Sequence, residues 1–177
     1  MEGLLVFDLE TQKLADEVGG WSHIRDMRLA VAVTYSPAQD GYRVYTEGEV
    51  ARLIADLRAA RKVVGYNLYG FDYKVLRAYT ADPLDDLPTV DMLRDLADRL
   101  GWRPKLNDVA AATLGLAKSG DGLDAVRWFR QGQLERVIDY CRRDVEVTWR
   151  VYDYGRQNGH VKILDRSWRE RLVPVRW

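Results

Sequence analysis

The first part of the chain holds three apolar segments that predict strands. Residues 3–8 carry apolar side chains at consecutive positions, which is typical of a strand buried on both faces. Two further segments lie at 28–35 and 42–46, separated by a turn, and the three strands are expected to form a meander. The polar connection at 11–27 is long for a compact domain, and connections of that length are usually functional or mobile.

A helical period follows the meander. Thr46 and Glu49 form a capping-box pair directly before an apolar period, which predicts a helix over 48–60. A short buried strand is expected at 62–65. The order strand, helix, strand implies a parallel pairing through a right-handed crossover.

The remaining segments continue the alternation of strands and helices. A helix is expected to begin at Phe71, and a short strand is expected at 89–91. A further helix is expected to end before Gly115. The stretch 119–122 is expected to be a loop, and an apolar stripe predicts the longest helix over 133–154. The order of these elements predicts an α/β fold, with one mixed sheet of a three-strand meander plus parallel strands, flanked by helices.

The pattern changes after the longest helix. We expect residues 1–154 to form one domain and residues 155–177 to form a C-terminal extension. The extension contains two alternating segments, HVKIL and RLVPV, which suggest a hairpin packed on the same domain.

Composition narrows the class of protein. Hydrophobic residues make up 47% of the chain and charged residues 31%, as in globular proteins with a core. Lys plus Arg equals Asp plus Glu at 27 each. The chain therefore lacks the overall positive charge that is typical of proteins that coat nucleic acid. The single cysteine, Cys141, excludes an intrachain disulfide and a cysteine-cluster metal site. The chain shows no signal-peptide pattern and no membrane-length apolar run, so we expect a cytoplasmic protein without a membrane partner.

Two carboxylates lie where the first apolar strand ends. Asp8 and Glu10 are two residues apart, and in a strand that spacing directs both side chains to the same side. Ligands tend to bind at such strand ends in α/β folds, and a divalent cation would offset the repulsion between the two charges. The alternative is an ordinary solvated strand end.

Two later segments contribute further acids. Asp72 stands at the start of a helix after the strand at 62–65, where it could simply be a favourable acid of the first turn. Asp144 lies at the edge of the apolar stripe of the longest helix, with Tyr140 one turn earlier, and could be a surface acid.

Taken together, the three segments resemble the motifs of the DEDD superfamily of 3′–5′ exonucleases. The match is D-x-E at Asp8 and Glu10, N-x-x-x-F-D ending at Asp72, and Y-x-x-x-D ending at Asp144, in the order of the family. Tyr140 places the resemblance in the tyrosine (DEDDy) branch, which includes polymerase proofreading domains, and the spacing also resembles stand-alone nuclease domains. The resemblance implies an RNase H-like fold, which agrees with the order of elements.

The resemblance also implies a mechanism and a cofactor. Asp8, Glu10, Asp72 and Asp144 would hold two divalent cations, Mg²⁺ or Mn²⁺, about 3.5–4 Å apart, and Tyr140 would orient the attacking water. The expected reaction is 3′–5′ hydrolysis of single-stranded DNA or RNA to nucleoside 5′-monophosphates. Residues that would bind the substrate are Leu9, Thr11, Asn67 and Phe71. A helicase or another nucleic-acid enzyme is the partner that the resemblance suggests.

Other residues have weaker functional interpretations. Trp21, Tyr66 and Tyr69 could stack on bases, although ordinary packing is the commoner role of such aromatic residues. Several basic residues could contact phosphates or could simply be solvated: Lys74, Lys105, Lys118, Arg142 and Arg143.

Two other functions stay open at this point. One is a catalytically inactive nucleic-acid-binding or scaffold module with the exonuclease fold, although four intact acids and Tyr140 speak against the loss of activity. The other is a metal-dependent phosphodiesterase that acts on small nucleotides.

Overall fold

A computed structural model of the chain describes residues 2–116, 122–164 and 169–177. Five strands form the main sheet, in the spatial order β3-β2-β1-β4-β5. Their bounds are β1 Leu4–Thr11, β2 Leu29–Ser36, β3 Gly41–Thr46, β4 Lys62–Gly65 and β5 Thr89–Asp91. β1, β2 and β3 pair antiparallel, whereas β4 pairs parallel with both β1 and β5. The predicted mixed sheet, a meander continued by parallel strands, is confirmed. The parallel pairing expected directly between the strands at 42–46 and 62–65 is wrong, because the crossover through α1 places β4 beside β1, with β2 and β1 between it and β3.

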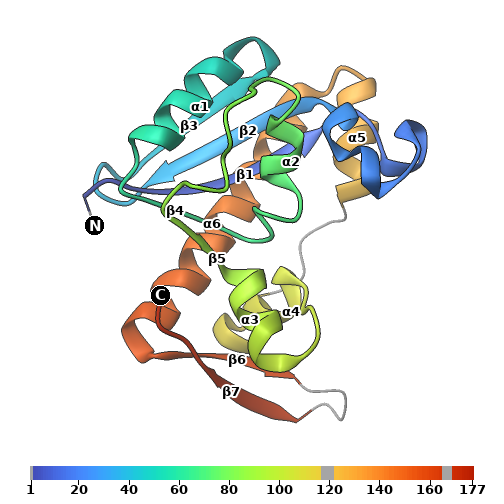
Figure 1. Cartoon of the computed structure of the whole chain (residues 1–177). Helices are drawn as coiled ribbons and strands as arrows, with labels where there is room; N and C mark the ends of the chain where they lie inside the picture. The colour runs from blue at the N-terminus through green and yellow to red at the C-terminus, as the bar shows by residue number, and fades with distance from the viewer. Residues whose placement is uncertain (1, 117–121, 165–168) are drawn as a thin grey trace.

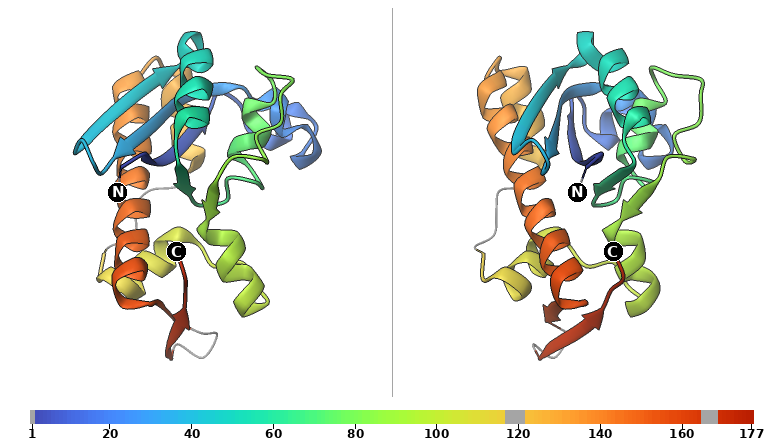
Figure 2. Two further views of the ribbon diagram at one scale, coloured as in Figure 1. Left: turned by 60° about the vertical axis from the view of Figure 1, so that its left-hand side comes forward. Right: turned by 90° about the vertical axis from the view of Figure 1, so that its left-hand side faces the viewer.

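Helices cover both faces of this sheet (Figures 1 and 2). α1 packs on one face and the long α6 on the other, so that the sheet lies between them (Figure 2). The longer helices are α1 Val50–Ala59, α3 Met92–Leu100, α4 Leu106–Leu114, α5 Gly122–Arg130 and α6 Leu134–Asn158. The short ones are α2 Asp72–Leu76 and the 3₁₀ helices η1 Ala15–Val18, η2 Trp21–Met27 and η3 Glu47–Glu49.

Burial on both faces explains the apolar runs in the sequence. In β1, Val6 joins the core beneath α6, whereas Phe7 and Leu9 join the core beneath α1 and α2. The capping box predicted before α1 is present, with the Glu49 side chain accepting a hydrogen bond from the Thr46 amide at 3.0 Å. The apolar residues that predicted these strands and helices are therefore the ones that face the core.

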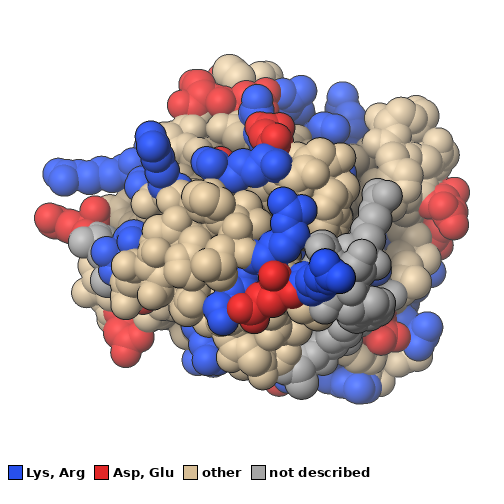
Figure 3. All heavy atoms as spheres, turned by 90° about the horizontal axis from the view of Figure 1, so that it is seen from below, with Lys and Arg blue, Asp and Glu red and all other residues tan. Residues whose placement is uncertain are grey.

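The lower end of the molecule is formed by α3, α4 and a hairpin of β6 His160–Leu164 and β7 Glu170–Pro174 (Figure 1). The two strands pair antiparallel, as the alternating pattern in this part of the chain suggests. Thr113 of α4 exchanges two hydrogen bonds of 3.0 Å with the main chain of Lys162. Seen from below, Lys and Arg side chains are interspersed with Asp and Glu (Figure 3).

α6 extends further than the sequence pattern predicts. It ends at Asn158 with Gly159 in the left-handed conformation (φ 69°), not before Gly155. Gly155 lies inside the helix, and the ring of Trp177 packs directly on it, so a side chain at this position would clash. The boundary expected between residues 154 and 155 therefore falls within a continuous helix.

The connection at 11–27 contains η1 and η2 and lies beside α5 at the end of β1 (Figure 1). It is therefore not a loop throughout, and several of its residues share a cavity with Asp8 and Glu10 of β1. Of the loop expected at 119–122, residues 119–121 lie outside the described residues, and Gly122 begins α5. Within the described residues, no helix is long and apolar enough to cross a membrane.

Candidate active site

β1 places two carboxylates on the side of the sheet that faces α6. Asp8 and Glu10 lie opposite Val33 and Val31 of β2, so one edge of this part of β1 is fully paired. On the other edge, β4 pairs with β1 only as far as Val6. The sheet therefore opens beside Asp8 and Glu10, and side chains from elsewhere can approach them.

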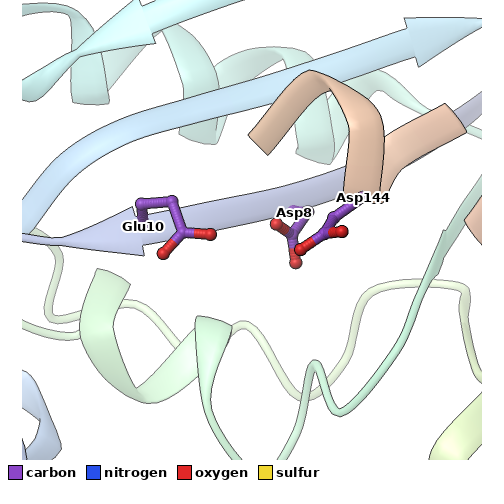
Figure 4. A group of neighbouring side chains, drawn as sticks. All are labelled: Asp8, Glu10 and Asp144. Carbon is purple, nitrogen blue, oxygen red and sulfur yellow. The ribbon is translucent and has the colours of Figure 1, made fainter. Parts of the chain in front are cut away.

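α6 delivers a third carboxylate to the opening. One oxygen each of Asp8, Glu10 and Asp144 lie within 4.8 Å of one another. Figure 4 shows Asp8 and Glu10 on the strand and Asp144 on the helix that crosses it. Two elements far apart in the sequence thus bring these three carboxylates to one point, and we refer to them as the acid cluster.

Asp72 lies beside the acid cluster, but its carboxylate oxygens are not within 4.8 Å of all three members. It is the first residue of α2, its side chain is only 2% exposed, and its Oδ1 atom has no hydrogen-bond partner among the described residues. Burial raises the pKa of Asp72 well above its ordinary value, and the charge of Asp8 raises it further. A buried oxygen without a partner beside other carboxylates is a position that a cation would stabilise.

The electrostatics of the acid cluster are unfavourable without a counter-charge. Burial raises the pKa of Asp8, and the charge of Asp144 adds to this effect. Burial likewise raises the pKa of Glu10, followed by the charges of Asp8, Asp144 and Asp72. Among the described residues, no Lys or Arg forms an ion pair with Asp8, Glu10 or Asp72. Oxygen-only ligands of this charge suit hard divalent cations.

Tyr140 lies one turn before Asp144 and is 8% exposed. Burial raises the pKa of its hydroxyl group well above the ordinary value, and the charges of Asp144, Glu10 and Asp8 act in the same direction. The ring of Trp128 from α5 packs edge-on against the Tyr140 ring at 6.0 Å, and the Arg136 guanidinium lies 4.6 Å over Trp128. The Tyr140 hydroxyl therefore stays protonated and is held beside the carboxylates.

Cys141 is a member of the site that sequence reasoning did not find. Its Sγ lies 3.4 Å from the main-chain oxygen of Asp8 and 3.6 Å from Asp8 Oδ2. Burial raises the pKa of the thiol, and the charges of Asp8, Glu10 and Asp144 raise it further, so the S–H group can donate to Asp8. In the sequence Cys141 is one apolar position among many on α6, and only the crossing with β1 gives it a polar neighbour.

A cavity of about 520 Å³ opens onto the acid cluster. Leu9, Thr11 and Phe71, which were predicted to bind substrate, line it together with Asp72. Of the three aromatic residues with an expected stacking role, Trp21 and Tyr66 line the cavity and Tyr69 does not. Trp21 is 69% exposed and meets Phe71 edge-on at 6.4 Å, so an aromatic pair lines the same cavity as the carboxylates.

Asn67 lies outside this cavity. It adopts the left-handed conformation (φ 76°), and its side-chain oxygen accepts a hydrogen bond of 2.6 Å from Arg103. The main-chain N–H group of Asn67 donates a hydrogen bond to the Asp91 carboxylate, which also accepts one from the main-chain N–H group of Tyr69. Asp91 thus organises the turn before α2, a role that the sequence pattern did not reveal.

The basic residues considered as phosphate contacts do not line the cavity either. Lys74, Lys105 and Arg143 are exposed elsewhere on the surface, and Arg142 lies 4.4 Å over the ring of Tyr42. Lys118 lies outside the described residues.

The rim of the cavity comes from the long connection at 11–27 and from α5, and of these two only α5 was not singled out in the sequence. η1 and α5 face each other across the opening, and Glu17 of η1 forms an ion pair with Arg130 of α5. Further lining residues come from these segments and their neighbours: Leu14, Ala15, Asp16, Met27, Leu123 and Val126. An amphipathic period over 122–130 is the signal that could have revealed α5 in advance.

The mixed sheet with its crossing helix and acid cluster defines the RNase H-like class of α/β protein, and residues 5–155 match the family model RNase_H_2 of the RNase_H superfamily. The chain belongs to this superfamily.

One solved structure with a similar fold is described as the zinc ion bound form of the crystal structure of the E. coli ExoI–ssDNA complex, with a TM-score of 0.50 and 15% identity. The similarity covers 88% of this chain and 40% of the E. coli chain, so the protein spans less than half of that chain. At this identity the likeness concerns the fold alone. No curated protein matches the chain.

Proposed function

We propose that the protein is a metal-dependent 3′–5′ exonuclease of the tyrosine branch, which releases nucleoside 5′-monophosphates from single-stranded nucleic acid. The observation that carries this proposal is the acid cluster, with buried Asp72 beside it and Tyr140 one turn from Asp144. Membership of the RNase_H superfamily supports a nuclease, and the ExoI–ssDNA structure supports a single-stranded substrate.

The residues of the chain have distinct roles in this proposal. Asp8, Glu10, Asp72 and Asp144 would hold two divalent cations, Mg²⁺ or Mn²⁺. When bound, such cations supply an activated water and counter-charge for the leaving oxygen. The Tyr140 hydroxyl, protonated at neutral pH and hydrogen-bonded to Asp144, would position the attacking water beside that carboxylate.

The cavity beside the acid cluster would hold the terminal nucleotide. Leu9 and Phe71 supply apolar contacts for the sugar and base, and the exposed ring of Trp21 offers a face on which a base can stack. The Thr11 hydroxyl already donates to the main-chain oxygen of Lys13, so we assign Thr11 a place in the cavity wall. With the sugar and base on these apolar groups, the scissile phosphate is the group that we assign to the carboxylates.

A digestion assay tests the proposal. A 5′-labelled single-stranded oligonucleotide should shorten by one nucleotide at a time in Mg²⁺ or Mn²⁺ and stay intact in EDTA. Asp144→Asn should abolish the ladder, since this residue supplies one of the three clustered carboxylates. DNA and RNA strands of equal sequence are compared in the same assay.

A circular single strand separates an exonuclease from an endonuclease. The circle should survive in Mg²⁺, because the cavity is proposed to hold a free 3′ end. Internal cutting of the circle would contradict the proposal. Binding without any cleavage would favour the inactive module, and cleavage of small nucleotide esters alone would favour a phosphodiesterase.

A further inference from the structure

A second cavity, of about 400 Å³, adjoins the one that opens onto the acid cluster. The two share three apolar lining residues, Leu14, Leu123 and Val126. The second cavity adds the polar residues Arg127, Arg130 and Gln131. A molecule that extends out of the first cavity across these apolar side chains therefore reaches two arginines.

One face of α5 forms most of this second cavity. Leu123, Val126, Arg127 and Arg130 stand at positions i, i+3, i+4 and i+7, which lie on one side of a helix. The opposite side of α5 is occupied by packing, since Ala125 is buried and Trp128 contacts Tyr140. The face that lines the cavity is thus apolar at its beginning and cationic at its end.

This combination matches the chemistry of a nucleotide. A base has apolar faces that can lie on aliphatic side chains, and its phosphate is an anion that arginine binds in a forked geometry. The first cavity offers carboxylates to a scissile phosphate through bound cations, whereas the second offers direct positive charge. The two cavities are therefore suited to two successive phosphates of one strand.

We propose that the second cavity binds the nucleotide directly 5′ of the terminal one, with its phosphate on Arg130 and Arg127. This inference rests on the proposed exonuclease function, and it assigns to α5 the recognition of a strand instead of a single nucleotide.

Glu17 has a specific part in this arrangement. Arg130 is ion-paired with Glu17 of η1, whereas Arg127 is paired with Asp124 of its own helix at 3.0 Å. Both arginine side chains are about half exposed or more, at 48% for Arg130 and 65% for Arg127, so a phosphate can reach them. A phosphate that binds Arg130 through its Nη2 atom competes with the Glu17 carboxylate, which makes Glu17 a competitor of the substrate.

Two substitutions at one ion pair should therefore have opposite effects. The probe is a fluorescent decanucleotide with phosphorothioate linkages at its 3′ end, titrated in Mg²⁺ and followed by anisotropy. Arg130→Gln should weaken binding roughly 3- to 10-fold, between the effects of an exposed ion pair and of a charged hydrogen bond. Glu17→Gln should tighten binding, because it removes the competing carboxylate. If both substitutions weakened binding equally, the pair would only brace η1 against α5, and the inference would be wrong.

The dependence on salt gives a second binding readout. The slope of log K against log salt should become shallower by about 0.7 in Arg130→Gln, the value expected when the protein neutralises one phosphate fewer on a single strand. Arg156→Gln is the matched control, because Arg156 forms a similar surface ion pair with Asp153 near the far end of α6. It should leave both the affinity and the slope unchanged. An unchanged slope in Arg130→Gln would contradict the inference.

A short substrate separates this inference from the proposed function. Thymidine 5′-(p-nitrophenyl phosphate) carries the scissile phosphate but no second phosphate for Arg130, so Arg130→Gln should leave its kcat/KM unchanged and lower kcat/KM for the oligonucleotide. Equal losses on both substrates would overturn the second-nucleotide site. Wild-type protein that degrades no oligonucleotide would instead overturn the exonuclease function itself.

Discussion

The Tyr140 hydroxyl is the group for which a functional and a structural role differ most clearly. Tyr140→Phe keeps the ring that packs against Trp128 and removes only the hydroxyl beside Asp144. If that hydroxyl orients the attacking water, kcat should fall about 10- to 10²-fold, at the low end of what positioned proton-handling groups contribute. Turnover on an oligonucleotide is measured together with the melting temperature, which should stay near that of the wild type.

The control for Tyr140 is affinity for Mn²⁺, which should be unchanged because the residue is not proposed as a ligand. Wild-type turnover in Tyr140→Phe would remove the hydroxyl group from the mechanism. It would also weaken the assignment to the tyrosine branch.

Glu10 should give the metal-free protein a distinctive dependence on pH. Its folded-state pKa is raised above the ordinary 4.5 by burial and by three neighbouring carboxylates. A group with a raised pKa contributes stability that is fully present below its unfolded pKa and is lost as the pH rises through its folded pKa. Glu10→Gln should therefore raise the melting temperature in EDTA at pH 8, and the gain should vanish near pH 4.5.

Thermal melts of both proteins from pH 4.5 to pH 8 measure this difference. Carboxylates with lowered pKa values, such as Glu47 and Asp56, affect both proteins equally and cancel in the comparison. A difference in melting temperature that did not change with pH would show that Glu10 is not destabilised in the folded state.

Residues in the motifs could be predicted because a strand fixes the side of every second residue. Asp8 and Glu10 share a side of β1 as their spacing requires, and the structure brings Asp144 to them. Cys141 and Glu17 could not be predicted, since their significance depends on partners that are 133 and 113 residues away. The catalytic roles of the acids stay predictions until the variants are measured.

At the scale of elements, the contact between α6 and the C-terminal residues is the one most open to test. A Cβ atom on Gly155 would lie 2.6 Å from the Trp177 ring, whose position is fixed by stacking on Tyr152 and by a hydrogen bond of 2.9 Å to Asp95. Gly155→Ala should destabilise the protein by about 1–3 kcal/mol through overpacking, although alanine favours a helix. Chemical denaturation measures the change.

A double variant isolates the cause. In a Trp177→Ala background the ring is gone and Val175 Cγ2, at 3.1 Å, is the nearest remaining atom, so the cost of Gly155→Ala should fall to about zero, with the remaining contact partly offset by the usual gain of alanine over glycine of about 0.5–1 kcal/mol in a helix. If Gly155→Ala cost the same in both backgrounds, the ring would not be the reason for the glycine.

Gly155 also shows where sequence reasoning about elements fails. A glycine after an apolar stripe is typical of a helix end, and a glycine beneath an aromatic ring looks the same in the sequence. The apolar stripe predicted α6, but the reason for a glycine at position 155 is the ring of Trp177, which packs from 22 residues away in the chain. α5 was not recognised as an element. Its amphipathic face lines a cavity only because η1 lies opposite it in the folded protein.

At the scale of the whole molecule, divalent cations should act as stabilising ligands. They would bind the folded acid cluster and not the unfolded chain, which at 100 times Kd stabilises by about 2.7 kcal/mol. For a protein of this size the melting temperature should rise by about 5–10 °C in Mn²⁺. Asp8→Ala should abolish the rise, whereas Arg156→Gln should retain it. An equal rise in Asp8→Ala would place the cation elsewhere.

The mixed character of the sheet was accessible from the sequence because consecutive apolar runs indicate a meander and a strand-helix-strand unit indicates parallel strands, whereas the position of β4 beside β1 was not. The two adjoining cavities could not be predicted from the sequence. They lie between η1, β1 and α5, and the local hydrophobic pattern does not determine the distances between these elements. The open edge of β1 beyond Val6 likewise results from the short length of β4.

The contact between Cys141 and Asp8 has a practical consequence. The chain contains one cysteine, and it is buried where α6 crosses β1. A thiol reagent such as 5,5′-dithiobis(2-nitrobenzoate) can reach it only when the helix separates from the strand, so the rate of a one-to-one colour reaction measures how often that crossing opens. Cations that join Asp8 to Asp144 should slow the reaction, and the protein thereby contains its own reporter of the opening of β1 from α6.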